Sequence, residues 1–326
     1  MKVRRILFES IEHVVMEETE IGPIASGHVR VKNLFSLIST GTELLQLRGA
    51  MGPFQHSEVG YCAVGRIVEG EGDTGFQKGD YVHTHGHHNE IIDVPTEKAR
   101  KTFIPVDPEL AEQATFLPLG KVAMHGLHRV HISMGDWIVV FGLGIVGNLT
   151  AQLARMASAD RLLAIEPQPM RRKVAQELGI RTIDPDDGDY ISKIQTITGG
   201  GANVIFETSG HPVALKDAMK IAAYGAQISV VAGHYGIREL DMKTDFQNKE
   251  LSLIGARRVD DEAESTLADR WTVARCAREF YEMIKSGKVS IEPLITHRMV
   301  PEQASEVYER LLKKDNSMLA VLFDWS

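Results

Sequence analysis

One stretch of sequence indicates the fold of the second half of the chain: Asp136-Trp137-Ile138-Val139-Val140-Phe141-Gly142-Leu143-Gly144-Ile145-Val146-Gly147. An apolar run typical of a strand breaks into the pattern G-x-G-x-x-G and continues into a helical pattern. Gly142 allows the tight turn, Gly144 lets the backbone approach a pyrophosphate, and Gly147 lets the helix pack against the strand. The free N–H groups at the start of that helix would bind the phosphates. The pattern predicts a dinucleotide-binding turn; a glycine-rich turn without a ligand is the structural alternative.

A second apolar run, residues 162–165, ends in Glu166 at the distance from Gly144 where the dinucleotide fingerprint places an acid. The carboxylate would accept hydrogen bonds from the hydroxyl groups of the adenosine ribose, and it would repel a 2′-phosphate. Glu166 therefore favours NAD(H) as the cofactor. Arg171 and Arg172 lie close enough in sequence to bind a 2′-phosphate, which keeps NADP(H) as the alternative.

The composition is that of an ordinary globular protein. The chain has 326 residues, 43% of them hydrophobic and 25% charged, so we expect two domains. The net charge of −8 argues against a nucleic-acid or anionic-membrane partner, and no apolar run reaches the roughly 18–20 residues of a membrane helix. Cys62 and Cys276, the only cysteines, show neither metal-ligand spacing nor a disulfide framework. Without a targeting signal we expect a cytoplasmic protein.

The pattern of elements changes near residue 119. Before it, short apolar runs are separated by Gly, Pro and Asp without a βαβ unit, which predicts a β-rich domain; the clearest runs are 29–38, 61–68, 81–82 and 91–94. After it, strands alternate with helices, which predicts a doubly wound parallel sheet. The expected strands are 138–141, 162–165, 202–207, 228–233, 251–255 and 319–323, and the expected helices are 146–156, 170–178, 213–224, 268–285 and 301–313.

Four short motifs give the chain its family resemblance: Gly79-Asp80-Tyr81-Val82 and the stretches 206–210, 249–255 and 295–298. Together with the glycine fingerprint they resemble the medium-chain dehydrogenase/reductase superfamily. The resemblance implies an α/β chain with a GroES-like domain, residues 1–118 and 258–326, and a Rossmann domain, residues 119–257. It also implies a homodimer or homotetramer joined edge to edge through the Rossmann sheets.

Zinc-dependent members of that superfamily place zinc ligands at three positions that this chain fills differently. The residues there are Thr40, Tyr61 and Leu119. A catalytic zinc needs about three protein donors, so we expect no zinc and predict no metal site. The sequence Ser39-Thr40-Gly41-Thr42-Glu43 resembles a zinc-lacking branch, whose motif bacteriochlorophyllide dehydrogenase-like enzymes share.

Without zinc, a side chain must move the proton on the substrate oxygen. The resemblance places Thr42, Glu43, Tyr61 and Lys121 around the cleft as candidates for this role. Each has a structural alternative: Tyr61 can fill the core, Glu43 can cap a helix or pair with a base, and Thr42 can bind the local backbone. Lys121, in an apolar-flanked run, is expected to have a functional role or to pair with Glu43.

The segment His83-Thr84-His85-Gly86-His87-His88 holds four histidines, and the resemblance places it at the substrate pocket. If it is extended, His83, His85 and His87 share one face and His88 takes the other. We predict that His85 and His87 contact the substrate. Metal binding, with Glu43 as a fourth ligand, and a solvated turn are the alternatives.

These observations predict an NAD(H)-dependent oxidoreductase that interconverts an alcohol and a carbonyl on a small polar substrate such as a sugar, polyol or amino alcohol derivative. An NADPH-dependent quinone or enoyl reductase and a non-catalytic NAD(H)-binding sensor are the alternatives. Further expected cofactor contacts are Ile145, Val146, Ser209, Gly210, Ala232 and Gly233.

Overall fold

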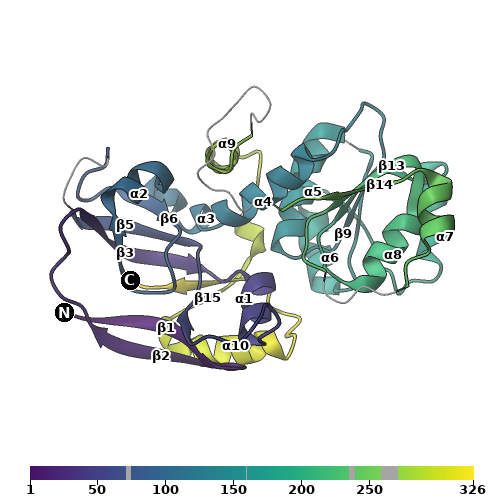
Figure 1. Ribbon diagram of the computed structural model, residues 1–326. Helices are drawn as coiled ribbons and strands as arrows, with labels where there is room; N and C mark the ends of the chain where they lie inside the picture. Colours follow the sequence, from purple (N-terminus) through teal and green to yellow (C-terminus); the bar gives the residue numbers. More distant parts are fainter. Residues whose placement is uncertain (71–74, 159, 235–238, 258–270) are drawn as a thin grey trace. The chain divides into compact units, whose positions relative to one another are not determined.

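A computed structural model describes residues 1–70, 75–158, 160–234, 239–257 and 271–326 (Figure 1). The chain forms two compact units: unit 1 contains residues 1–118 and 291–326, and unit 2 contains residues 119–290. The first boundary lies where the sequence places it. The second lies at 290/291, whereas the sequence analysis placed it at 257/258.

Helix α9, Val273–Lys285, explains the later boundary because it packs within unit 2. A Cβ atom added at Gly120 would lie 2.1 Å from the ring of Phe280 on this helix. The side chain of Gln152 bonds the backbone N–H and carbonyl of Ser290, at 2.8 and 3.0 Å. The C-terminal segment is therefore divided between the units. Residues 258–270 lie outside the described part of the chain.

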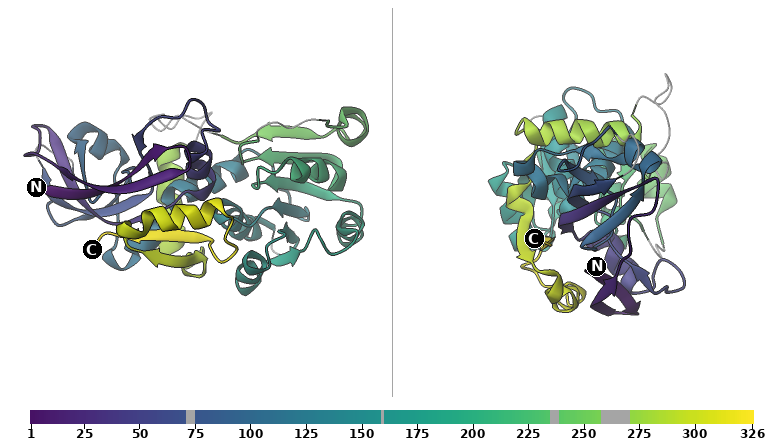
Figure 2. Two further views of the ribbon diagram at one scale, coloured as in Figure 1. Left: turned by 90° about the horizontal axis from the view of Figure 1, so that it is seen from below. Right: turned by 90° about the vertical axis from the view of Figure 1, so that its left-hand side faces the viewer.

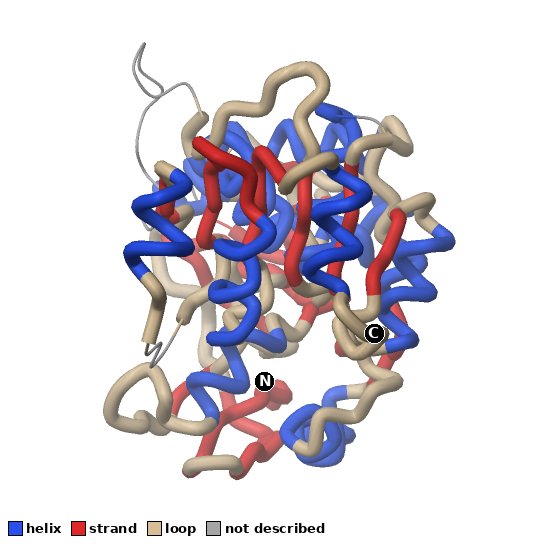
Figure 3. The backbone as a smooth tube through the Cα atoms, turned by 90° about the vertical axis from the view of Figure 1, so that its right-hand side faces the viewer, coloured by secondary structure: helices blue, strands red, loops and turns tan. Residues whose placement is uncertain are grey.

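Unit 2 is built on a parallel sheet, whose strands are drawn in red in Figure 3. The strand order is β11-β10-β9-β12-β13-β14. The strands are β9 Ile138–Phe141, β10 Leu162–Ile165, β11 Arg181–Ile183, β12 Ala202–Glu207, β13 Ala222–Val230 and β14 Ser252–Gly255. Its helices are α4 Leu117–His128, α5 Ile145–Ser158, α6 Pro169–Glu177, α7 Tyr190–Thr198, α8 Pro212–Ile221 and α9, with short helical turns at Met242–Phe246 and Gln247–Lys249. This arrangement confirms the predicted doubly wound fold.

Both faces of this sheet are buried because its residues alternate between two cores. Ile138 and Val140 belong to the core that includes residues of α5 and α6, whereas Val139 and Phe141 belong to the core that includes residues of α7 and α8. The continuous apolar run in β9 is thus explained.

Two parts of unit 2 differ from the sequence-based expectation. Strand β11 and helix α7 were not predicted, although Asp189 caps α7 by accepting a hydrogen bond from Ser192 N at 3.1 Å. The helix predicted over 213–224 ends at Ile221, and β13 begins at once. Ala222 pairs with Ala202 of β12, so residues whose local sequence pattern is helical form part of a strand instead.

Unit 1 holds two sheets and both chain termini (Figure 2). One sheet has the order β2-β1-β4, and the other has the order β15-β16-β3-β5-β6-β8 with β7 paired to β3. The strands are β1 Lys2–Ser10, β2 His13–Glu20, β3 His28–Leu37, β4 Ser57–Glu58, β5 Ala63–Gly70, β6 Tyr81–Thr84, β7 Ile91–Pro95, β8 Ile104–Pro105, β15 Ile295–Met299 and β16 Ala320–Asp324. The helices are α1 Thr40–Leu47, α2 Thr96–Thr102, α3 Ala111–Ala114 and α10 Ala304–Leu312, with short helical turns at Pro108–Leu110, Glu292–Leu294 and Pro301–Gln303.

The C-terminal segment completes unit 1. Strand β16 pairs with β3, and the fully buried Trp325 and Tyr308 share a core with Phe8 of β1. The β-rich character of this unit is as predicted, but helices α1 and α2 were not. Across the described ranges, no helix is long and apolar enough to cross a membrane.

Candidate functional site

The turn between β9 and α5 has the close packing that its glycines predict. A Cβ atom at Gly147 would lie 2.0 Å from the carbonyl oxygen of Gly142 and 2.5 Å from Thr208 Oγ1. Gly142 has a φ of 87° and lies against Ser209, so it needs glycine both for its backbone and for space. At Gly144 the nearest atom to an added Cβ is Arg171 Nη1, at 4.0 Å. The turn is thus tight on its protein side and open around Gly144.

Glu166 lies beside this turn and is held by backbone. Its carboxylate is buried and accepts hydrogen bonds from Leu143 N at 2.6 Å and Gln168 N at 2.9 Å. Each carboxylate oxygen has two lone pairs, so both retain capacity for a further donor. Arg172 donates to the carbonyl oxygen of Glu166 at 2.8 Å and pairs with Asp184 at 2.6 Å, which engages its guanidinium within the protein.

The turns after β12 and β13 meet at the same carboxyl-terminal edge of the sheet. Thr208 N donates to the carbonyl oxygen of Phe141 at 3.0 Å, and a Cβ atom at Gly210 would lie 2.9 Å from the carbonyl oxygen of Gly233. Ala232 N donates to the carbonyl oxygen of Glu207 at 3.1 Å. The structure therefore brings Ser209, Gly210, Ala232 and Gly233 together with the glycine turn, at the edge where parallel sheets bind ligands.

Glu207 and His234 also lie at this edge, and the sequence analysis did not select them. Glu207 has no exposed surface. Its carboxylate accepts from Ser209 N at 2.9 Å, Gly210 N at 3.1 Å, Ser209 Oγ and His234 Nε2. Glu207 is the last residue of strand β12, in the motif F-E-T-S-G. Its place at the end of a predicted strand is the sequence signal that could have identified it.

In unit 1, Tyr61 stands in a cluster of hydroxyl groups. Its phenol oxygen lies 2.5 Å from Ser39 Oγ and 3.4 Å from Thr42 Oγ1. Burial raises the pKa of Tyr61 well above its usual value, with a further contribution from nearby Cys62, so the phenol stays protonated across the physiological range. The structure thus brings together two predicted residues, Tyr61 and Thr42.

Glu43 belongs to a closed network next to that cluster. Its carboxylate is buried and accepts hydrogen bonds from Ser39 N at 2.7 Å, His88 Nε2 at 3.2 Å and the hydroxyl of Tyr308. His88 Nδ1 in turn accepts from Ser36 Oγ at 2.7 Å, and Ser36 Oγ accepts from Trp325 Nε1 at 2.9 Å. The structural reading of Glu43, as a residue that binds the start of its own helix and a base, is the one that its contacts support.

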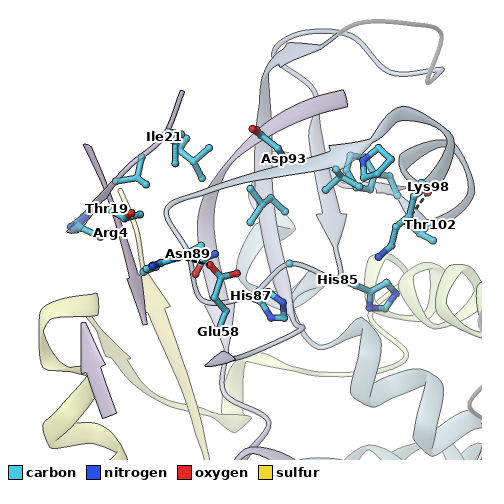
Figure 4. A pocket seen from close by; sticks show the side chains of 18 residues that line it. Arg4, Thr19, Ile21, Glu58, His85, His87, Asn89, Asp93, Lys98 and Thr102 are labelled. Carbon is cyan, nitrogen blue, oxygen red and sulfur yellow. Dashed lines mark hydrogen bonds and ion pairs between the residues drawn. The ribbon is translucent and has the colours of Figure 1, made fainter. Parts of the chain in front are cut away.

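The histidine segment does not stay extended. Strand β6 ends at Thr84, His83 is buried with its ring 5.3 Å from that of His85, and His88 turns inward to Glu43. His85 and His87 line a pocket of about 340 Å³ together with Arg4, Glu58, Asn89, Asp93, Lys98 and Thr102 (Figure 4). Neither Tyr61 nor Glu43 is among the described residues that line it. The two histidines and the Tyr61 cluster are thus separate features of unit 1.

Lys121 lies on α4 in unit 2 and is half-buried. Glu43, its expected partner, lies in unit 1 and already accepts three hydrogen bonds. The pairing of Lys121 with Glu43 and its role in proton transfer stay predictions.

Comparison with known proteins agrees with this architecture. A family profile described as zinc-binding dehydrogenase matches residues 146–272. The chain is 34% identical over 203 residues to 2-dehydro-3-deoxy-L-galactonate 5-dehydrogenase of Pseudoalteromonas atlantica, a match that spans 62% of this chain and 55% of that relative. It is 28% identical over 325 residues to D-guloside 3-dehydrogenase of Escherichia coli K12, a match that spans 87% of this chain and 90% of that relative.

Solved structures of the same fold hold pyridine nucleotides. A zinc-binding dehydrogenase homologue of Sinorhizobium meliloti bound to NADP superposes with a TM-score of 0.81 at 20% identity over 99% of both chains. An alcohol dehydrogenase of Escherichia coli CFT073 complexed with NADH superposes with a TM-score of 0.80 at 18% identity over 99% of both chains.

These matches support the predicted medium-chain dehydrogenase/reductase superfamily. The predicted architecture, a GroES-like domain with a Rossmann domain, is confirmed. Its relatives are named dehydrogenases that act on CH–OH groups, which supports an alcohol–carbonyl oxidoreductase.

The residues at the turn between β9 and α5 fit a dinucleotide. The turn is open at Gly144, begins a helix at Ile145 and Val146, and has the Glu166 carboxylate beside it. These residues would hold the pyrophosphate and the adenosine ribose.

The three positions that the resemblance assigns to zinc ligands hold side chains whose chemistry does not suit that metal. Thr40 and Tyr61 offer hydroxyl groups, the latter bonded to Ser39, and Leu119 offers no donor atom. Within the described ranges, no three His, Cys, Asp or Glu side chains are grouped as a metal site.

Proposed function

We propose that this protein interconverts an alcohol and a carbonyl on a small polar hydroxylated substrate, with NAD(H) as the cofactor and without catalytic zinc. The observation that carries the proposal is the placement of the buried Glu166 carboxylate against the glycine turn, with Leu143 N as a donor. When bound, the nicotinamide ring accepts or gives the hydride. The protein's own residues must therefore bind the cofactor, orient the substrate and handle a proton.

The preference for NAD(H) rests on charge and on spare hydrogen-bonding capacity. The Glu166 carboxylate can accept from ribose hydroxyls, whereas a 2′-phosphate would bring negative charge against a buried negative charge. Arg172, which could have offset that charge, is engaged with Asp184 and two backbone carbonyls.

Tyr61 is our choice for the group that hydrogen-bonds the substrate oxygen. Its raised pKa keeps it neutral, so it acts as a donor and not as a permanently ionised base. Ser39 and Thr42 lie within hydrogen-bond reach of its oxygen and can pass a proton along. Glu43 contributes by fixing Ser39 through the backbone, and Lys121, His85 and His87 stay as further candidates to be tested by substitution.

Two relatives support a polar, hydroxyl-bearing substrate, since their names denote oxidation of a guloside and of a deoxygalactonate derivative. A sugar, polyol or amino alcohol derivative is therefore the substrate class that we propose.

Fluorescence titration of the protein with NADH and NADPH tests the cofactor part of this proposal. We expect NADH to bind at least about tenfold more tightly, because a repelled or unpaired phosphate costs more than 1 kcal/mol. Glu166→Ala should reduce that preference, whereas Glu177→Ala, an exposed change on α6, should leave it intact. Equal or tighter binding of NADPH by the unaltered protein would sink the assignment.

A panel of polyols, sugars and amino alcohols with NAD⁺, and of the matching carbonyls with NADH, tests the chemistry. Tyr61→Phe should lower kcat by about 10² or more on any active substrate without weakening NADH binding. Tight NADH binding with no turnover on the whole panel would favour the non-catalytic sensor.

An NADPH-dependent quinone or enoyl reductase is the second candidate, and one observation favours it. The guanidinium of Arg171 lies near Gly144 and, among the described residues, does not share the ion pair with Asp184 or the backbone hydrogen bonds that hold Arg172. If Arg171 binds a 2′-phosphate, Arg171→Ala should weaken NADPH far more than NADH in the same titration.

We also propose a homodimer or homotetramer. Strand β14 ends the sheet order of unit 2 and offers an edge for pairing with a second copy. Light scattering coupled to size-exclusion chromatography would give the mass of the assembly, and a mass of 36.1 kDa would exclude this proposal.

A further inference from the structure

His234 has one ring nitrogen committed and the other without a partner. Its side chain is 6% exposed, and Nε2 bonds the carboxylate of Glu207. Nδ1 is buried, and no hydrogen-bond partner in the described part of the chain reaches it. A buried polar atom without a partner costs free energy, so such an atom at a ligand-binding edge points to a ligand.

The surroundings of Glu207 fix which nitrogen carries the proton. An ionised carboxylate offers about four acceptor sites. Glu207 fills them with Ser209 N, Ser209 Oγ, Gly210 N and His234 Nε2, all of which can donate. A carboxylate in that setting accepts from Nε2–H, and the neutral imidazole then presents a bare lone pair on Nδ1. Nδ1 of His234 can therefore accept a hydrogen bond from an N–H or O–H donor.

The position of His234 selects the donor. His234 follows Gly233, whose carbonyl oxygen lies against Gly210, and Ser209 lies against Gly142 of the dinucleotide turn. The turns after β9, β12 and β13 are thus adjacent at one edge. A dinucleotide with its pyrophosphate at the β9 turn extends along that edge toward β12 and β13. Its nicotinamide end carries ribose hydroxyls as O–H donors and, on the ring itself, one N–H donor group, the carboxamide NH₂.

We propose that His234 Nδ1 accepts a hydrogen bond from the carboxamide NH₂ of the nicotinamide ring, and that Glu207 positions the imidazole for it. His234 is then a specificity-determining residue for the cofactor's reactive end, and Glu207 acts through it. The proposal rests on the proposed function only in requiring that a nicotinamide dinucleotide binds.

The test compares NAD⁺ with 3-acetylpyridine adenine dinucleotide, in which a methyl group replaces the carboxamide NH₂ and the carbonyl oxygen remains. We would measure binding of both to the purified protein by isothermal titration calorimetry, without any substrate. The unaltered protein should bind NAD⁺ about five- to tenfold more tightly, the value of one hydrogen bond. His234→Phe should bind the two ligands within about twofold of each other.

His131→Phe is the matched control. His131 is an exposed histidine of unit 2 whose backbone bonds Gln227, near the amino-terminal ends of the strands. This variant should keep the full discrimination.

Each other outcome overturns the proposal in a recognisable way. Equal binding of the two ligands by the unaltered protein would leave NAD⁺ binding established and the His234 contact refuted. Discrimination that survives in His234→Phe would assign the contact to another group. If neither dinucleotide binds, the proposed cofactor fails together with this contact. The comparison of ligands on the unaltered protein needs no substitution, so a poorly folded variant would not obscure it.

Discussion

Each unit buries a glutamate that is paired with a histidine, and the two pairs differ in whether the second ring nitrogen of the histidine has a hydrogen-bond partner. In unit 1, His88 bonds Glu43 through Nε2 and Ser36 through Nδ1, so both ring nitrogens are satisfied. In unit 2, His234 bonds Glu207 through Nε2, and Nδ1 has no hydrogen-bond partner among the described residues. The first arrangement is complete within the described residues, whereas the second leaves one buried nitrogen without a partner there.

The donors to the two carboxylates differ as well. Glu43 binds Tyr308, which lies 265 residues away in the sequence, and thereby ties α1 to α10. Glu207 binds Ser209 and Gly210, two and three residues away, within a single turn. A closed network of distant partners stabilises a domain, whereas the local turn at Glu207 is the place where we propose a ligand contact.

The largest effect that we predict separates the two histidines. His88→Phe should lower the free energy of unfolding by about 3 kcal/mol, because it removes a donor from a fully buried carboxylate and a partner from Ser36. His234→Phe should cost about 1 kcal/mol, because Glu207 keeps three donors. Urea unfolding, monitored by hydrogen exchange in each unit, would measure the loss of unfolding free energy in both variants. Equal losses would remove the distinction between a closed and an open pair.

Gly147→Ala is expected to have the next largest effect, in unit 2. The added Cβ would lie 2.0 Å from a backbone oxygen, so α5 must move from the strand, at a cost of about 2 kcal/mol. The same movement should weaken NADH binding at least about tenfold in a fluorescence titration.

Gly255→Ala is the control for that change. An added Cβ there would meet no atom within 4 Å, and the backbone φ of Gly255 is not positive. A variant at Gly147 that binds NADH normally would show that the close approach of helix and strand is not needed for the cofactor turn.

The same contrast explains which parts of the molecule the sequence predicts. The glycine turn, Glu166 and the contacts of Ser209 and Gly210 depend on residues a few positions apart within strand–turn units, so a short pattern contains the whole geometry. The network of Glu43 depends on Tyr308, Ser36 and Trp325, which come together only when the C-terminal segment packs into unit 1. No local pattern carries that information.

The errors follow the same division. The extended conformation that the sequence analysis considered for the histidine segment ends at Thr84, and His88 turns inward to bond Glu43, a contact between residues 45 positions apart. The second domain boundary differs because Phe280 of α9 packs on Gly120, 160 positions earlier in the chain.

Tyr308→Phe tests the closed network with a smaller change. The substitution removes one hydroxyl that donates to Glu43 and leaves the ring contact with Phe8 in place. We expect a loss of about 1.5 kcal/mol, typical of a hydrogen bond to a charged group. Tyr281→Phe, on α9 of unit 2, serves as a tyrosine control for the hydrogen-exchange readout in unit 1. A loss below about 0.5 kcal/mol for Tyr308→Phe would show that the network tolerates an unfilled acceptor.

The smallest effect on stability that we predict concerns a partly exposed carboxylate outside both glutamate–histidine pairs. Glu90 pairs with Arg4 at 3.1 Å, and both side chains keep some exposure, 21% and 25%. Burial alone would raise the pKa of Glu90, but hydrogen bonds from the side chain and backbone N–H of Arg4 outweigh it and lower the pKa. A carboxyl with a lowered pKa in the folded state stabilises the fold above its unfolded-state pKa of 4.5, and this contribution is lost as the pH falls through the folded value.

Glu90→Gln should therefore lower the free energy of unfolding by about 0.5 kcal/mol at pH 7, since solvent weakens a partly exposed pair. The difference from the unaltered protein should shrink as the pH falls below 4.5, where the native carboxyl also becomes neutral. Glu97→Gln, whose side chain is 81% exposed, should show no measurable difference at either pH. Urea unfolding at a series of pH values would measure these differences in unfolding free energy. A difference between Glu90→Gln and the unaltered protein that grows on acidification would contradict the lowered pKa of Glu90. Only a carboxyl with a raised pKa in the folded state behaves in that way.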